Sequence, residues 1–170
     1  MALDISPFER YRSLIDDWGA FREALSRPLP TCLWVNELRC DASTVIDRFE
    51  ARGFELQPMA WRPGAFRVSG ATKLGNSVEF KTGLIHLQEE VSMIPVHVLD
   101  PQPGERVADL CAAPGNKTAQ LGVMMGNRGT VVANDAHYGR IRGIRMNSQR
   151  LGLCNVSISH ADATSLPRDT

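Results

Sequence analysis

The chain has 170 residues, 43% of them hydrophobic, with 19 basic and 19 acidic side chains and a formal net charge of zero. This length and composition predict a globular protein with one good core or two small ones, and they exclude a disordered chain. Residues 1–100 carry 11 basic and 14 acidic side chains, and residues 101–170 carry 8 and 5. Neither balance has the strongly basic character of an unspecialised nucleic-acid binder, so any RNA contact has to come from local patches.

Location and metal content follow from what the sequence lacks. The apolar stretches are shorter than the ~20 residues of a membrane helix, and the first residues lack the basic flank of a signal peptide, so a cytoplasmic location and no membrane partner are expected. Cys32, Cys40, Cys111 and Cys154 show no metal-ligand spacing, and the histidines are scattered. Free thiols and no metal site are therefore expected.

A helix is expected at the N-terminus. Ser6 would cap it, Pro7 would be its first residue, and Glu9 would reach back to the cap. The helix would end at residues 28–30, where two prolines stand. Its apolar positions recur at helical spacing, at Phe8, Tyr11, Ile15, Trp18, Phe21 and Leu25.

Strands and one helix are expected next. Residues 31–38 alternate like a strand, residues 43–52 indicate a short helix closed by Gly53, and residues 54–69 indicate one or two further strands. This order predicts a small α+β accessory domain over residues 1–80. Aromatics and arginines alternate in residues 61–67, which suits either an RNA-recognition surface or a hairpin that buries its aromatic rings.

Residues 81–170 predict part of a parallel sheet. From Leu84 a bridging segment leads into strand, helix, strand, helix and strand, with strands at 107–111, at 131–135 and after residue 155. This is the pattern of one half of a doubly wound α/β sheet, with only its first three strands. The first strand would keep an open edge, so a truncated chain and association through that edge are expected.

The loop between the first of these strands and its helix, residues 109–118, predicts a cofactor site. Its small residues let the backbone approach a ligand, and the helix would begin near Lys117. A P-loop is excluded, because Asn116 and Cys111 stand where it needs glycines. Gly115 is the only glycine of the loop, which also excludes the dinucleotide pattern. The methyltransferase version of the fold is the best fit.

The sequence Asp-Leu-Cys-Ala-Ala-Pro-Gly-Asn-Lys-Thr of residues 109–118 closely resembles the S-adenosylmethionine loop of the Nop/Sun family of RNA cytosine 5-methyltransferases. Upstream, residues 83–93 resemble the family's Gly-x-x-x-x-Gln-x-x-x-Ser-Met lead-in, and residues 147–156 resemble its later helix and strand. The resemblance implies an incomplete Rossmann-like methyltransferase sheet, S-adenosylmethionine as cofactor, and RNA (rRNA or tRNA) as partner. It places the N-terminal half of the catalytic domain at residues 81–170.

The resemblance also implies a set of site residues. Asp135 would take the ribose hydroxyls of the cofactor and Asp162 the adenine side, although both could be ordinary acids of strand-end loops. Asp109 is expected to serve the turn, and the other arginines near Arg140 to form a solvated face. The candidate cofactor-binding residues are Cys111, Ala112, Ala113, Pro114, Gly115, Asn116, Lys117, Asp135, Arg140 and Asp162.

Asn116 departs from the family, which usually has a second glycine there. If this position needs a positive φ, asparagine tolerates it better than other side chains do, and the loop survives with some strain and bulk. The expected consequence is a lower cofactor affinity, which Asn116→Gly would restore.

By the same resemblance, a cysteine thiolate attacks the cytosine ring, and the functional cysteines lie in Asp-Ala-Pro-Cys-Ser-Gly and Thr-Cys-Ser motifs. Neither motif occurs in residues 1–170, and Thr31-Cys32 imitates the second only by chance. No catalytic residue is therefore expected in this chain, which alone is predicted inactive. A non-catalytic RNA- or partner-binding module stays open as an alternative. A small-molecule methyltransferase is a second one, against which the extended lead-in argues.

Overall fold

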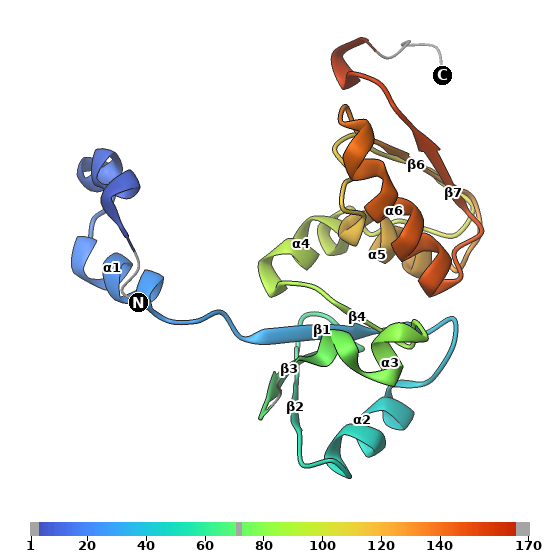
Figure 1. Ribbon diagram of the computed structural model, residues 1–170, viewed down its shortest axis with the longest axis horizontal. Coiled ribbons are helices and arrows are strands. Elements are labelled where there is room, and N and C mark those ends of the chain that lie inside the picture. The colour runs from blue at the N-terminus through green and yellow to red at the C-terminus, as the bar shows by residue number, and fades with distance from the viewer. Residues whose placement is uncertain (1–3, 71–72, 166–170) are drawn as a thin grey trace. The chain divides into compact units, whose positions relative to one another are not determined.

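The computed structural model describes residues 4–70 and 73–165 (Figure 1). The chain separates into two units, residues 1–30 and residues 31–170. Residues 1–3, on which the expectation of no signal peptide rests, and residues 71–72 and 166–170 lie outside the described ranges.

The first unit contains two helices where the sequence predicted one. A 3₁₀ helix, η1 (Ser6–Leu14), precedes α1 (Trp18–Ser26). The single-helix prediction was wrong because the Asp17 side chain accepts a hydrogen bond from the Ala20 N–H and so begins a new helix. The predicted cap at Ser6 was also wrong, because Ile5 is the N-cap residue of η1 and Ser6 is its first residue.

A four-stranded antiparallel sheet begins the second unit. Its strand order is β2-β3-β1-β4, with β1 (Thr31–Val35), β2 (Glu55–Pro58), β3 (Ala65–Ser69) and β4 (Ile85–Leu87). Its helices are α2 (Ala42–Glu50) and α3 (Val78–Lys81), with the 3₁₀ turn η2 (Leu74–Asn76) before α3. Leu33, Val45, Phe49 and Ile85 meet in its core.

Two elements differ from the sequence-based reading of residues 84–100. β4 pairs with β1, so this sheet extends to Leu87, whereas the sequence indicated only a bridging segment there. The helix α4 (Glu90–Leu99) follows, although Pro95 stands inside it and normally disfavours a helix interior. The division into domains at residues 80 and 81 stays a prediction.

The predicted parallel sheet is confirmed. Its strand order is β5-β6-β7, with β5 (Arg106–Asp109), β6 (Thr130–Asn134) and β7 (Val156–Ser159), and the connecting helices are α5 (Asn116–Met124) and α6 (Tyr138–Leu151). A 3₁₀ turn, η3 (Ala163–Ser165), follows. Within the described residues β5 pairs on one side only.

The helices cover one face of this parallel sheet (Figure 1). Val107 and Val131 pack with residues of α4 and α5, and Ala133 and Ile158 pack with Ile144 of α6. The opposite face leaves the Val132 side chain on the central strand 37% exposed. One face of the sheet is therefore buried and the other is open.

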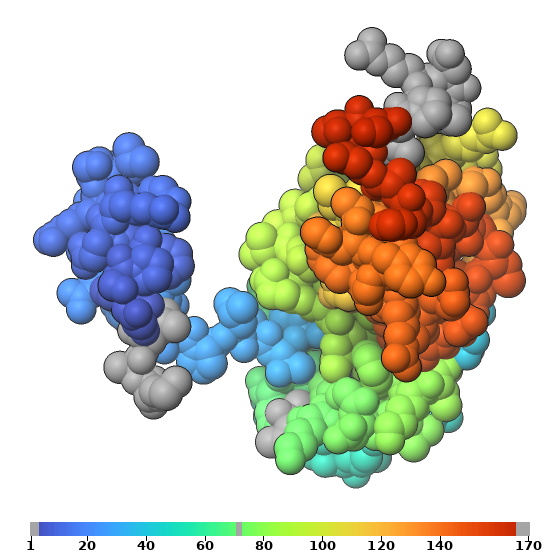
Figure 2. Space-filling view, turned by 45° about the horizontal axis from the view of Figure 1, so that its top comes forward, coloured from blue at the N-terminus to red at the C-terminus, as the bar shows by residue number. Residues whose placement is uncertain are grey.

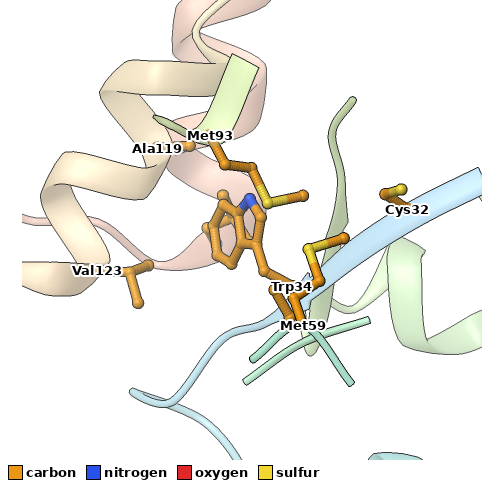
Figure 3. Packing of buried hydrophobic residues seen from close by; sticks show 8 residues of the cluster. Cys32, Trp34, Met59, Met93, Ala119 and Val123 are labelled. Atoms are coloured by element: carbon orange, nitrogen blue, oxygen red, sulfur yellow. The ribbon is translucent and has the colours of Figure 1, made fainter. Parts of the chain in front are cut away.

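The two sheets share a core built around Trp34 of β1 (Figure 3). The Trp34 ring is fully buried and packs with Met93 of α4, Ala119 and Val123 of α5 and, from α6, Leu151. Figure 2 shows the atoms of α3 (green) meeting those of α6 (orange) at the surface. This shared core fixes the parallel sheet and its loop against the antiparallel one.

Residues 61–67 lie in the turn between β2 and β3 and in the first part of β3, within a packed hairpin. Phe66 is 5% exposed and Arg62 9%, and the Arg67 guanidinium donates to both carboxylate oxygens of Glu90, at 2.6 and 2.7 Å. Trp61 packs against the shared core and donates to Glu90 at 3.3 Å. These contacts favour the hairpin interpretation over an RNA-stacking surface, because the rings are not free to receive bases.

Candidate cofactor-binding site

The loop between β5 and α5 turns at Gly115. Gly115 has φ +101° and directly precedes the first residue of α5. A Cβ at this position would lie 2.9 Å from the Ile144 Cα, so α6 approaches the loop as closely as glycine allows. The strain predicted for Asn116 was wrong, because the positive φ belongs to Gly115 and Asn116 is the first residue of α5.

Asp135, directly after β6, is hydrogen-bonded to this loop. Its Oδ2 accepts the Ala113 N–H at 3.0 Å, and its Oδ1 accepts the His137 N–H at 3.0 Å. These two hydrogen bonds, from His137 first and Ala113 second, and the nearby Arg140 charge lower the pKa of the Asp135 carboxyl. Asp135 is therefore ionised at neutral pH, and a carboxylate with two such bonds keeps acceptor capacity for a ligand hydroxyl.

Arg140 contacts the carbonyl group of the same loop residue, Ala113. Its Nη2 donates to the Ala113 carbonyl oxygen at 2.8 Å, and its Nη1 lies 3.9 Å from Asp135 Oδ2. Ala113 thus donates its N–H to Asp135 and accepts a hydrogen bond at its carbonyl oxygen from Arg140. The structure brings these three predicted site residues together.

Asp162 lies after β7 and is exposed. Its Oδ1 accepts both the N–H and the hydroxyl of Thr164, at 2.9 and 2.7 Å, and these bonds lower the pKa of its carboxyl. Both bonds go to Oδ1, which leaves Oδ2 for another donor. Asp162 shares no hydrogen bond with the 109–118 loop in the described structure.

Asn134 links the two regions, and the sequence reading missed it. The Asn134 side chain is fully buried, and its Nδ2 donates to the carbonyl oxygens of Leu110 and Ala161, at 3.2 and 2.9 Å. Leu110 belongs to the candidate loop and Ala161 adjoins Asp162. The buried Asn134 amide at the end of the central strand is therefore hydrogen-bonded to both candidate loops. In the sequence, its position directly before Asp135 is the feature that could have indicated this role.

The remaining loop candidates divide by exposure. Cys111, Pro114 and Lys117 are exposed, whereas Ala112 and Ala113 are buried. The Ala112 N–H donates to the Asn134 carbonyl at 2.8 Å, which continues the ladder of the sheet into the loop. Asp109 accepts the Thr118 hydroxyl at 2.7 Å, in agreement with its expected role in the turn.

Two residues of the lead-in segment 83–93 contact the loop or the helix that follows it. His86 Nε2 lies 3.1 Å from Asn116 Oδ1. Gln88 accepts the Trp34 indole N–H at 2.8 Å and donates to Gln120 of α5 at 3.3 Å. The Gln88 position belongs to the motif that the sequence indicated, but its contacts with β1 and α5 required the fold.

The arginines of α6 do not all behave as a solvated face. Arg142 and Arg145 are exposed, as expected. Arg150, in contrast, is half-buried, and its Nη1 donates to the carbonyl oxygens of Phe80 and Ile85, at 2.6 and 3.1 Å. For Arg150 the expectation was wrong, because the antiparallel sheet, which the sequence did not place, covers this end of the helix.

The residues fit S-adenosylmethionine in chemistry. A glycine turn with a positive φ brings backbone next to a ligand, and two ionised carboxylates follow neighbouring parallel strands at the edge where such sheets bind nucleotides. Within residues 4–70 and 73–165, no group of three or more His, Cys, Asp or Glu is placed to hold a metal ion. No helix of these ranges has both the length and the apolar character of a membrane span.

A parallel sheet with a loop of this kind defines the class of Rossmann-like methyltransferase domains. Residues 96–170 match the family model described as 16S rRNA methyltransferase RsmB/F. The resemblance to the Nop/Sun family is thereby confirmed.

Relatives agree with this assignment. Ribosomal RNA small subunit methyltransferase F of Shewanella loihica is 36% identical over 145 residues, which are 81% of this chain and 30% of that protein. A 28S rRNA (cytosine(4447)-C(5))-methyltransferase of Homo sapiens is 35% identical over 87% of this chain and 18% of its own length. The chain thus spans less than a third of either relative.

Solved structures confirm the fold. A methyltransferase homologue from Pyrococcus horikoshii matches 84% of this chain and 47% of its own, with a TM-score of 0.79 and 39% identity. NSun6 from Pyrococcus horikoshii with SFG matches 91% of this chain and 64% of its own, with a TM-score of 0.82 and 18% identity, which speaks for the fold alone.

Proposed function

We propose that this chain forms the cofactor-binding part of an S-adenosylmethionine-dependent RNA cytosine 5-methyltransferase. The observation that carries the proposal is the pair of hydrogen bonds that Asp135 and Arg140 make to Ala113, beside the Gly115 turn. Two charged side chains fix a loop whose backbone stays at the carboxyl edge of a parallel sheet. Such a preorganised edge suits a nucleoside ligand.

Each predicted site residue has a defined task in this proposal. Asp135 holds the Ala113 N–H and accepts the ribose hydroxyls with its remaining lone pairs. Asp162 offers Oδ2 to the adenine side, and residues 111–117 line the methionine end. When bound, S-adenosylmethionine supplies an electrophilic methyl group. Cys111 contributes its backbone and its exposed side chain to this lining rather than a nucleophile.

Ribosomal RNA is the proposed substrate class, because the relatives reported above carry that name. A transfer RNA substrate has no such support. A cytoplasmic location belongs to the same proposal. Methyl transfer by residues 1–170 alone is not expected, since none of its four cysteines stands in a motif like those of the family's functional thiols.

The test is calorimetric titration of S-adenosylhomocysteine, the stable product form of the cofactor, into the chain. Asp135→Ala should weaken binding by about tenfold or more, because it removes charged-acceptor hydrogen bonds. Asp47→Ala, at an exposed acid of α2, serves as the matched control. Unchanged affinity in the Asp135 variant would remove this residue from the site, and no binding by the wild type would refute the proposal for this chain.

A second assay addresses turnover. The chain is incubated with tritiated S-adenosylmethionine and unmodified ribosomal RNA, and tritium in the RNA is counted. No transfer is expected from residues 1–170. Transfer would show that one of Cys32, Cys40, Cys111 and Cys154 acts as nucleophile, and Cys→Ala variants would identify it.

A further inference from the structure

His86 of β4 connects the antiparallel sheet to the candidate loop. Its ring is 2% exposed, with Nε2 3.1 Å from Asn116 Oδ1 and Nδ1 2.6 Å from Nη2 of Arg150. An arginine only donates, so Nδ1 must accept, and the ring proton is on Nε2, where it donates to Asn116. Burial lowers the pKa of His86 to about 4, which keeps the ring in this neutral form at pH 7.

Arg150 anchors this ring from α6. Besides the two carbonyls of residues 80 and 85, its guanidinium lies 4.0 Å from the centre of the Phe80 ring and donates to Asn147 Oδ1 at 3.3 Å. Its planar fork is thereby held in one orientation. The atom that faces His86 is consequently a fixed donor.

Asn147 returns the network to the loop. Its Nδ2 donates to the Pro114 carbonyl oxygen at 3.0 Å. Pro114 and Asn116 are the two neighbours of Gly115, the residue with φ +101°. A continuous chain of hydrogen bonds therefore runs from Pro114 through Asn147, Arg150 and His86 to Asn116, and it closes around the glycine turn.

We propose that His86, Asn147 and Arg150 are positioning residues that hold both flanks of the Gly115 turn, and that the antiparallel sheet thereby sets the geometry of the cofactor loop. Asn116 accepts the hydrogen bond from His86, and its amide oxygen is the reason for a polar side chain at this position. The effect on cofactor affinity rests on the function proposed above, whereas the effect on the loop does not.

The network is tested by a double-mutant cycle of His86→Phe and Asn116→Ala. Phenylalanine approximates the ring but lacks both nitrogens. Amide hydrogen exchange of residues 112–118 is measured at pH 7, and global stability is measured by urea unfolding, so that loop opening is separated from unfolding. Each single variant should speed exchange in the loop about tenfold. The double variant should exchange less than about twofold faster than either single variant, because both substitutions remove the same hydrogen bond.

Asn147→Ala is the second arm, and it keeps the proposal testable if His86→Phe does not fold. It removes the hydrogen bond from half-buried Asn147 to the Pro114 carbonyl and should also speed exchange at residues 112–118. His97→Phe, an exposed histidine of α4, is the control and should leave the loop unchanged. Unchanged loop exchange in Asn116→Ala and Asn147→Ala, or additive effects in the cycle, would overturn the proposal.

Titration with S-adenosylhomocysteine distinguishes the two levels. Positioning predicts that Asn116→Ala and Asn147→Ala each weaken binding about fivefold or more at unchanged global stability. Faster loop exchange with unchanged affinity would overturn the role in cofactor binding. A wild type without binding would refute the proposed function, and the exchange data would still decide whether the network holds the loop.

Discussion

Gly83 and Arg150 are in backbone contact across the two sheets. A Cβ at Gly83 would lie 2.0 Å from the Arg150 carbonyl oxygen, and Gly83 has φ +74°. The glycine just before β4 is therefore required twice, for its backbone conformation and for the approach of the last turn of α6.

Gly83→Ala should lower the free energy of unfolding by about 2–4 kcal/mol. The new Cβ would clash with the Arg150 backbone carbonyl, which cannot move away as a flexible side chain could. Gly139→Ala in α6 is the matched control, because a Cβ there meets nothing within 4 Å. Urea unfolding of both variants measures the difference. Equal stabilities would show that the two sheets can separate at Gly83 without cost.

Asn36 predicts a contrast between two substitutions. This fully buried side chain donates through Nδ2 to the carbonyl oxygens of Gly83 and Leu151, at 2.9 and 3.0 Å. Asn36→Ala should cost about 1–3 kcal/mol, because it leaves two buried acceptors without this donor. Asn36→Asp should cost more, because it also places a carboxylate against two carbonyls. Chemical denaturation that ranks the alanine variant as the less stable would contradict this geometry.

Asp135 should give the protein an acid-sensitive stability. Its folded-state pKa is lowered, so its contribution is present above the ordinary carboxyl value of 3.8 and is lost as the pH falls through the lower folded value. Asp135→Asn lacks this titration. Wild type and variant should therefore differ most in stability near neutral pH and converge below pH 4, measured by urea unfolding across that range. A constant difference would mean that the carboxylate charge is not used.

The cysteines should react in two classes. Cys111 and Cys154 are exposed, whereas Cys32 is buried and Cys40 half-buried, and burial raises the pKa of both of these thiols. Ellman's reagent at pH 8 should modify two thiols rapidly in the folded chain and four after unfolding. Saturating S-adenosylhomocysteine should slow Cys111 alone. Protection of Cys154 instead would place the ligand away from the loop.

Asn116→Gly should weaken cofactor binding, the reverse of the expectation from sequence. That expectation assumed a strained φ, whereas the structure shows helical backbone and an amide oxygen bonded to His86. The affinity for S-adenosylhomocysteine should fall about fivefold, by calorimetry. A tighter complex would mean that bulk at this position outweighs the hydrogen bond.

The parallel strands and the loop were predictable because their signals are local. An apolar strand, a glycine turn and an acid after the next strand lie within a few residues of one another. β4 was missed because three residues carry no usable periodicity, and its pairing with β1 spans some fifty residues. The roles of His86 and Arg150 depend on that pairing, so no local pattern could reveal them.

The core around Trp34 has a consequence for how the protein unfolds. Side chains from β1, α4, α5 and α6 fill one shared cluster, so loss of packing in either sheet disturbs the packing of the other. Residues 31–165 should consequently melt in a single cooperative transition, with slow amide exchange in β1 and β6 failing together. Evolution of the antiparallel sheet would then be constrained by the parallel sheet and its candidate loop, and the two would be inherited as one piece.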